Sequence, residues 1–174
     1  MGYRRFAPFA EPDFFDFQMI TDLVHCNVIS MLNVTRSVIP LLLKQNKSGA
    51  AIINISSFSA MISFPYSSLY AASKAFILHF TKCILPEVKG TNVNIQAVCP
   101  ILVATALSRK TETSFFIPSP KAYVKSALDM LGVERVTMGY FPHAIQALFL
   151  SNWEALLVRK STTVYKRDLN KKTE

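Results

Sequence analysis

Two short apolar stretches decide the fold: residues 50–56 read Ala50-Ala-Ile-Ile-Asn-Ile-Ser56, and residues 93–99 read Val93-Asn-Ile-Gln-Ala-Val-Cys99. Each has the length of one strand and is rich in branched or small apolar residues, which is typical of a strand buried in a parallel sheet. Helical periodicity marks residues 17–43, before the first stretch, and residues 69–88, before the second. Alternating helices and strands predict a parallel α/β sheet with right-handed crossovers.

The pattern continues toward the C-terminus with a loop over residues 100–118, a helix from the N-cap Ser119 to about Leu131, and a short strand over residues 136–140. Residues 140–158 are apolar but are interrupted by Pro142, His143 and other polar residues, so we expect an amphipathic or buried helix there. Because the chain has no eighteen uninterrupted apolar residues, its sequence predicts no transmembrane helix. The 174 residues are expected to form one domain with a basic tail over residues 159–174.

The composition is that of a chain with a core, since 51% of the residues are hydrophobic and 17% are charged. The three cysteines are Cys26, Cys83 and Cys99, an odd number without paired spacing, which predicts reduced thiols. We expect Cys26 and Cys99 to pack inside apolar segments. No cluster of cysteine and histidine has zinc spacing, so no metal site is predicted.

The segment Tyr70-Ala-Ala-Ser-Lys74 places a phenol and an ammonium four residues apart, so on a helix the two groups share one face. A free tyrosine has a pKa near 10, too high for acid–base work at neutral pH, but a neighbouring ammonium favours the phenolate. Ser57, at the end of the first predicted strand, could hold a carbonyl oxygen while the tyrosine proton moves. These residue types suit the reduction of a ketone or the oxidation of an alcohol by a hydride-carrying cofactor.

The segments Asn54-Ile-Ser-Ser57 and Tyr70-Ala-Ala-Ser-Lys74 resemble the catalytic serine strand and the Tyr-x-x-x-Lys helix of the short-chain dehydrogenases/reductases. Asn27 is similar to that family's helical asparagine, which holds a water in the proton relay, although a buried amide could instead bond to the backbone. Ser56 rivals Ser57, but the spacing to Tyr70 favours Ser57. Pro100-Ile-Leu-Val-Ala-Thr105 resembles the family's Pro-Gly-x-Val-x-Thr turn beside the nicotinamide, with Ile101 in place of glycine.

The resemblance implies a site in three parts. The catalytic residues would be Ser57, Tyr70, Lys74 and Asn27, the cofactor-binding residues Tyr70, Lys74, Pro100, Val103 and Thr105, and the substrate-binding residue Ser57. Aromatic residues could line the substrate pocket or belong to the core: Phe58, Phe64, Tyr66, Phe115 and Phe116.

Within the family, Gly139-Tyr140, His143, residues 118–126 and the basic tail are similar to the 17β-hydroxysteroid dehydrogenases of types 3 and 12, reductases of the endoplasmic reticulum that use NADPH. The resemblance therefore implies an NADPH-dependent ketone reductase of apolar substrates. The type 3 likeness implies a 17-ketosteroid such as androstenedione, and the type 12 likeness implies a very-long-chain 3-oxoacyl thioester of fatty acid elongation. The segment His25-Cys-Asn27 favours the steroid.

The family's phosphate-binding loop, Thr-Gly-x-x-x-Gly-x-Gly, has no counterpart here, because the five glycines are not spaced in that way. Met1-Gly2 coincides with the end of the family's Asn-Asn-x-Gly motif. The sequence therefore predicts the C-terminal portion of a doubly wound, Rossmann-like fold, truncated before the Gly-rich loop and left with an open sheet edge. Whether it is an enzyme stays open: the alternative is a catalytically silent chain that dimerises through residues 17–43 and 69–88, with itself or with a full-length homologue.

The formal net charge is +8, and six basic and two acidic residues follow from Arg159 onward. The tail is either solvated or a contact surface for anionic lipid headgroups beside an apolar helix. Nucleic acid is not an expected partner, because the aromatic residues are not interleaved with the basic ones. Lys171-Lys-Thr-Glu174 matches the dilysine retrieval signal, which predicts a cytosol-facing location on the endoplasmic reticulum membrane.

Overall fold

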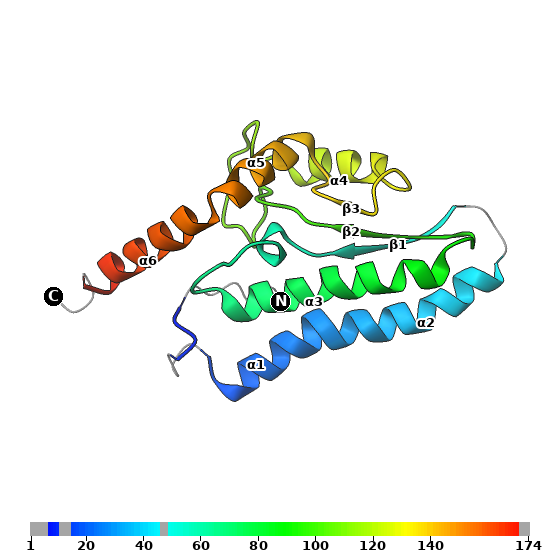
Figure 1. The fold of residues 1–174 in the computed structure, drawn as a ribbon, viewed down its shortest axis with the longest axis horizontal. Coiled ribbons are helices and arrows are strands. Elements are labelled where there is room, and N and C mark those ends of the chain that lie inside the picture. Colours follow the sequence, from blue (N-terminus) through cyan, green and yellow to red (C-terminus); the bar gives the residue numbers. More distant parts are fainter. Residues whose placement is uncertain (1–6, 11–14, 46–48, 171–174) are drawn as a thin grey trace.

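A computed structural model describes residues 7–10, 15–45 and 49–170 of the chain. Its middle layer is a parallel sheet in the order β1 (Ala50–Ile55), β2 (Val93–Val98) and β3 (Val136–Thr137). Figure 1 shows α1, α2 and α3 on one side of this sheet and α4 and α5 on the other. This arrangement confirms the predicted α/β fold, a portion of a doubly wound parallel sheet.

The first predicted helix is a continuous helical stretch with an irregular turn in its middle. It consists of α1 (Phe17–Val24), the π-helical turn η1 (His25–Ile29) and α2 (Ser30–Lys44). Asp16 caps its start, because the Asp16 carboxylate accepts a hydrogen bond of 2.6 Å from the backbone N–H of Met19. The π-helical turn is the segment that carries Asn27.

The second predicted helix, α3 (Ser68–Ile84), lies beside this stretch and is shorter than expected. It ends at Ile84 because Pro86 has no N–H to continue the helix, and the short 3-10 turn η3 (Pro86–Val88) follows. Its buried residues repeat at helical spacing and include Ile77, Leu78, Thr81 and Ile84. This face holds α3 against the sheet.

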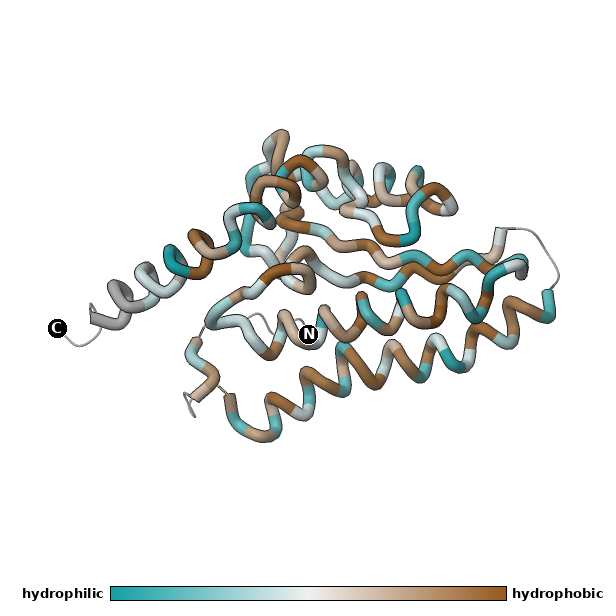
Figure 2. Tube along the Cα trace, viewed as in Figure 1, coloured by the Kyte–Doolittle hydropathy of each residue, from teal (hydrophilic) through white to brown (hydrophobic). Residues whose placement is uncertain are grey.

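The strand β2 uses both of its faces for the core, as alternation requires. Val93 and Ile95 pack with the buried part of α3, whereas Val98 packs with Tyr123 and Ala127 of α4 (Pro120–Asp129). Figure 2 shows the apolar segments of the strands lying between the two helical layers. The sheet is therefore a shared wall between two apolar clusters.

The C-terminal elements differ from the predicted ones at two breaks. The expected strand over residues 136–140 is two residues long, since Gly139 turns the chain with a φ of 69°. The expected helix over residues 140–158 is split at Trp153 into α5 (Phe141–Asn152) and α6 (Glu154–Asn170). Figure 1 shows α6 extending away from the body of the molecule. Ser119 caps α4 as predicted, accepting a bond of 3.3 Å from the N–H of Ala122.

The expectation of no membrane-spanning helix meets one candidate in the structure. Within the described residues, the 28-residue stretch Phe17–Lys44 is long enough to cross a bilayer and contains an 18-residue window with a mean hydropathy of 1.4. Polar residues interrupt it, so a search for an unbroken apolar run misses it. Ile39 and Leu42 on this stretch nevertheless pack against the core of the sheet, so length and composition alone do not place it in a membrane.

The predicted open edge of the sheet is present. In the described part of the chain β1 pairs with β2 alone, and Ile55 at its end is 53% exposed. A second strand could therefore add to β1.

Candidate active site at the carboxyl ends of the strands

The two long strands deliver their following residues to one edge of the sheet, because they run parallel. β1 leads into Ser56 and Ser57, and β2 leads into Cys99 and Pro100. Two backbone bonds join these segments: the N–H of Ser56 donates to Val98 O at 2.8 Å, and that of Phe58 donates to Pro100 O at 3.0 Å. The predicted catalytic serine and the predicted cofactor turn are therefore neighbours.

Helix α3 is held at this edge by a pair of side-chain bonds. The Ser56 hydroxyl donates to Lys74 O at 2.7 Å, and the Lys74 ammonium donates to Ile55 O at 2.9 Å. Ser56 is only 2% exposed, so its hydroxyl serves packing. This geometry separates the two rival serines, because Ser57 is only half-buried.

Ser57 marks the start of the 3-10 turn η2 (Phe58–Ala60), which packs against α3. Its oxygen accepts hydrogen bonds from the N–H of Ser59 at 3.2 Å and from the Ser59 hydroxyl at 3.0 Å. Because the oxygen acts as acceptor in both bonds, the Ser57 O–H proton is available to a carbonyl oxygen. Ser59 was not identified from the sequence, although it stands two residues after the serine that it orients.

Tyr70 and Lys74 share one face of α3, as their spacing predicts. The Lys74 Nζ lies 5.9 Å from the centroid of the Tyr70 ring, within the range of a cation–π contact. Burial lowers the pKa of Lys74, and the nearby thiols Cys26 and Cys99 partly oppose this shift. A half-buried ammonium beside a phenol is suited to stabilise a phenolate.

Asn27 reaches α3 from the π-helical turn. Its amide donates to the Ser73 hydroxyl at 3.0 Å, and Ser73 in turn donates to Tyr70 O at 2.7 Å. The Asn27 side chain is thus bound one residue before Lys74, which places it near the catalytic pair while giving it a packing role. Ser73 was missed by the sequence reasoning, although it lies inside the Tyr-x-x-x-Lys segment.

The predicted cofactor turn is organised by Ser108. The Ser108 hydroxyl donates to Val103 O at 2.6 Å and accepts from the N–H of Thr105 at 3.1 Å. Ile101, which stands where the family has glycine, does not have a positive φ, so a side chain fits there. That side chain packs with the apolar cluster of Phe58.

Four of the five aromatic candidates divide into two groups, and the fifth, Tyr66, stacks on Tyr165 of α6 with 4.2 Å between ring centroids. Phe58 is buried, and Phe64 packs against the same cluster, so both belong to the core. Phe115 and Phe116 are exposed and contact each other edge to face, with 5.1 Å between ring centroids. The loop pair is free to meet a ligand, whereas Phe58 serves the fold.

One cysteine prediction is wrong. Cys99 is buried as expected, and burial raises its pKa to about 11, but Cys26 is exposed. Cys26 stays accessible although Lys74 of α3 lies near it, and the apolar character of its segment does not reveal this exposure. Among the described residues, no group of three or more metal-ligating side chains comes together.

A family model described as short chain dehydrogenase matches residues 2–114. The chain belongs to the short-chain dehydrogenase family. Relatives named very-long-chain 3-oxoacyl-CoA reductase include that of Homo sapiens, 34% identical over 134 residues, and that of Rattus norvegicus, 38% identical over 126 residues. These alignments cover 77% and 72% of this chain but 42% and 40% of the relatives. This short-chain dehydrogenase therefore spans less than half the length of either relative.

Solved structures agree with the fold of the family. A short chain dehydrogenase from Burkholderia cenocepacia in complex with NADP has a TM-score of 0.69 and 27% identity, covering 91% of this chain and 65% of that one. A structure described for its 7β-hydroxysteroid dehydrogenase stereoselectivity has a TM-score of 0.65, 23% identity, and coverage of 80% and 57%. Family members with this fold thus bind nicotinamide cofactors.

Proposed function

We propose that this chain forms the catalytic part of an NADPH-dependent reductase of long-chain 3-oxoacyl thioesters. The observation that carries the proposal is the clamp between Ser56, Lys74 and Ile55, which brings the Tyr70–Lys74 face of α3 to the strand end that presents Ser57. The names of the relatives support the acyl thioester over the 17-ketosteroid that the segment His25-Cys-Asn27 had favoured.

Each residue then has one task at the substrate carbonyl. NADPH, when bound, supplies a hydride to the carbonyl carbon. The Ser57 O–H donates a hydrogen bond to the carbonyl oxygen, and the Tyr70 phenol gives that oxygen its proton. The Lys74 ammonium stabilises the phenolate that remains. Asn27, together with a water, would return a proton toward Tyr70 by way of Lys74.

The residues present suit the nicotinamide end of NADPH. An ammonium has three N–H donors, and Ile55 O takes one of those of Lys74, which leaves two for the hydroxyls of a ribose. The turn from Pro100 to Thr105, with half-buried Val103 and Thr105, would flank the ring. The five glycines supply no pyrophosphate loop, so this chain's own residues account for the nicotinamide end alone.

The first experiment measures NADPH binding through nicotinamide fluorescence, and then NADPH consumption with a long-chain 3-oxoacyl-CoA or with androstenedione. We expect saturable binding and turnover of the acyl thioester. Tyr70→Phe should lower turnover by about 10²–10⁴-fold, since it removes the proton donor. Tyr165→Phe is the matched control, because that tyrosine lies on α6 and its ring stacks on Tyr66 with 4.2 Å between centroids. Faster turnover of androstenedione would favour the steroid instead.

A second pair of variants separates the two serines. Ser57→Ala should lower turnover with little change in stability, because in the described part of the chain the side-chain oxygen of Ser57 bonds to its near neighbour Ser59. Ser56→Ala should lower stability by about 1 kcal/mol, because the Lys74 carbonyl, already part of the helix, loses its second donor. An equal loss of turnover in both folded variants would contradict these roles.

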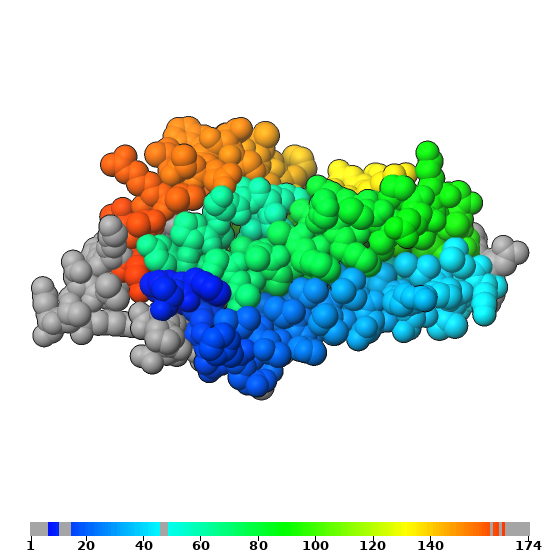
Figure 3. Space-filling view, turned by 60° about the horizontal axis from the view of Figure 1, so that its bottom comes forward, coloured from blue at the N-terminus to red at the C-terminus, as the bar shows by residue number. Residues whose placement is uncertain are grey.

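A chain that folds but binds no NADPH would support the catalytically silent alternative. Large apolar side chains are exposed on α1–α2 and α3, among them Val34, Leu41 and Phe76. Figure 3 shows α1–α2, in blue to cyan, running alongside α3, in green, on one face of the molecule. This face supports a dimer, with a second copy or with a full-length homologue, and sedimentation of Val34→Glu against wild type tests it.

The exposed surface of α5 and α6 supports contact with the membrane of the endoplasmic reticulum from the cytosolic side. Phe141, Leu148 and Phe149 are exposed on α5, and Arg159 and Lys160 are exposed further along on α6. An apolar face beside cations suits an anionic lipid surface. The predicted retrieval signal, residues 171–174, lies outside the described residues. Phe149→Asp should weaken co-sedimentation with phosphatidylserine vesicles, whereas Val133→Asp, at an exposed site beyond α4, should not.

A further inference from the structure

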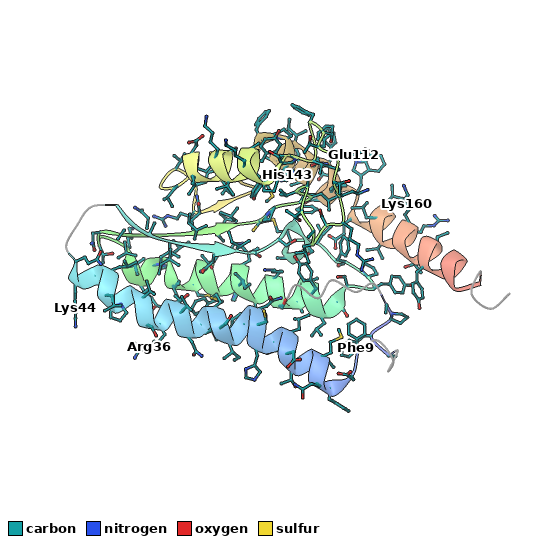
Figure 4. All side chains as sticks on the ribbon, turned by 180° about the vertical axis from the view of Figure 1, so that it is seen from behind. Phe9, Arg36, Lys44, Glu112, His143 and Lys160 are labelled. Carbon is teal, nitrogen blue, oxygen red and sulfur yellow. The ribbon has the colours of Figure 1, made fainter. Side chains whose placement is uncertain are left out.

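His143 is a buried titratable group that the proposed chemistry does not use. It lies in the first turn of α5 with none of its surface exposed. Its Nδ1 accepts a hydrogen bond of 3.4 Å from the N–H of Ile101, and its Nε2 lies 3.0 Å from Leu102 O. Figure 4 labels His143 between the α4–α5 layer and the sheet. One ring therefore binds two consecutive residues that are far from it in sequence.

These two bonds favour one neutral tautomer of the ring, although a backbone hydrogen bond with Phe116 favours the protonated form. The N–H of Ile101 is a donor, so Nδ1 must carry a lone pair, and Leu102 O is an acceptor, so Nε2 must carry the proton. Only the neutral Nε2–H tautomer satisfies both partners. Burial lowers the pKa of His143 below its ordinary value of 6.5, with the backbone of Leu102 and of Phe116 opposing the shift.

Two phenols surround the ring. Tyr123, from α4, and Tyr140, at the start of α5, have ring centroids 5.5 and 5.3 Å from that of His143. These are the titratable groups that face it, and in the described part of the chain no ionised side chain contributes to the shift of its pKa. Tyr123 is fixed in turn, because its hydroxyl donates to Met138 O at 2.9 Å.

Gly139 makes this arrangement possible. A Cβ on Gly139 would lie 2.6 Å from the Tyr123 hydroxyl oxygen, and the φ of 69° at this position favours glycine. The residues of Gly139-Tyr140-x-x-His143 thus act together. Gly139 leaves room for the Tyr123 hydroxyl, Tyr140 packs against the His143 imidazole, and this imidazole contacts Ile101 and Leu102.

We propose that neutral His143 is a positioning residue, which fixes the backbone of Ile101 and Leu102 and thereby sets the turn from Pro100 to Thr105 that flanks the nicotinamide. The inference rests on the proposed function only in the role given to that turn. The segment from residue 100 to 118 is mostly irregular, so anchors are needed to order it. Ser108 anchors its Val103–Thr105 part, and His143 anchors its beginning.

The test is amide hydrogen exchange on the 174-residue chain with three variants. His143→Leu removes both bonds, His143→Asn places an acceptor near the Nδ1 position, and His143→Gln places a donor near the Nε2 position. We expect the Leu and Gln variants to exchange the Ile101 amide about tenfold faster, and the Asn variant to retain its protection. The amides of β1 and α3 should not change. His79→Leu, at an exposed histidine of α3, is the matched control.

Three results would overturn the inference: unchanged exchange at Ile101 in the Leu variant, a uniform rise across the sheet, or equal effects of Asn and Gln. A pH series adds a signature that packing alone does not give. The protection factor of Ile101 should fall in wild type as the pH drops through the lowered pKa of His143, and stay flat in the Asn variant.

NADPH binding separates this inference from the proposed function. If wild type binds NADPH, the His143→Leu variant should bind it more weakly, and the His143→Asn variant should keep the wild-type affinity. Equal affinities of the Leu variant and wild type would overturn the positioning role. If wild type binds no NADPH, the proposed function fails, and the exchange data alone decide whether His143 sets the turn.

Discussion

The two helical layers of this molecule are joined to the sheet by different kinds of side-chain hydrogen bond. In the α3 layer, Ser56 and Lys74 make the tie, and both lie within or next to the catalytic segments themselves. In the α4–α5 layer, His143 makes the tie to Ile101, a residue that lies 42 positions away. In one layer, residues of the functional motif therefore also make the stabilising hydrogen bonds. The other layer depends on contacts between residues far apart in the sequence, which local spacing does not predict.

The largest effect should come from the apolar cluster under α3. Ile95→Ala removes a buried side chain from the cluster of Ile84, Val88 and Val93, and should lower the free energy of unfolding by about 2–5 kcal/mol. Val98→Ala, on the opposite face of β2, deletes less apolar volume and should cost roughly 2 kcal/mol. Urea denaturation of both variants measures the difference. A larger loss in Val98→Ala would make the α4 side the dominant core.

The glycine beneath Tyr123 should give the next largest effect. Gly139→Ala combines a positive φ, which costs about 1–2 kcal/mol, with a clash against the Tyr123 hydroxyl, which adds about 1–3 kcal/mol. Gly132→Ala is the matched control, because its φ is 80° and nothing lies within 4 Å of the added Cβ. Tyr123→Phe should recover part of the difference. Equal melting temperatures for the two alanine variants would contradict the clash.

A buried polar tie under α3 should have a smaller effect. Thr81 accepts a hydrogen bond of 2.9 Å from the Asn54 amide, and both residues are buried. Thr81→Val leaves that amide without its partner and should lower the free energy of unfolding by about 1–3 kcal/mol. Thr21→Val, at an exposed threonine of α1, should change it by less than about 0.5 kcal/mol. An unchanged free energy of unfolding in Thr81→Val would show that the hydrogen bond between Asn54 and Thr81 is dispensable.

The cysteine thiols should have the smallest effect on the free energy of unfolding at neutral pH. Cys26 and Cys83 should react with a maleimide in the folded chain, whereas buried Cys99 should react only after unfolding. Because the pKa of Cys99 rises from 9.0 to about 11, the folded chain keeps a proton that the unfolded chain loses. The free energy of unfolding should therefore fall as the pH rises from about 9 to about 11.

Cys99→Ala should reduce that alkaline trend and leave the part that comes from Tyr123, whose pKa burial also raises, while Cys83→Ser should leave the whole trend in place. Chemical denaturation at a series of pH values measures both variants. An unchanged slope in Cys99→Ala would assign the trend to another group.

Much of the site was predictable because it depends on spacing along one helix or at one strand end. The four-residue interval of Tyr70 and Lys74 fixes their shared face, and the apolar run of β1 fixes where Ser57 emerges. The helix start after Ser119 was predicted from the chemistry of a capping hydroxyl, whereas the end of α3 before Pro86 was missed, because the predicted helix ran to residue 88.

The sequence by itself thus determined the alternation of helices and strands and the family, and it predicted a catalytic set, since each depends on local periodicity or on a short motif. Only the tertiary structure decided that Cys26 is exposed, that Ser56 serves α3, that Asn27 binds Ser73, and that His143 binds Ile101. These outcomes depend on which side chains meet across layers. Such meetings are set by the packing of distant segments, which the spacing of residues along the chain does not specify.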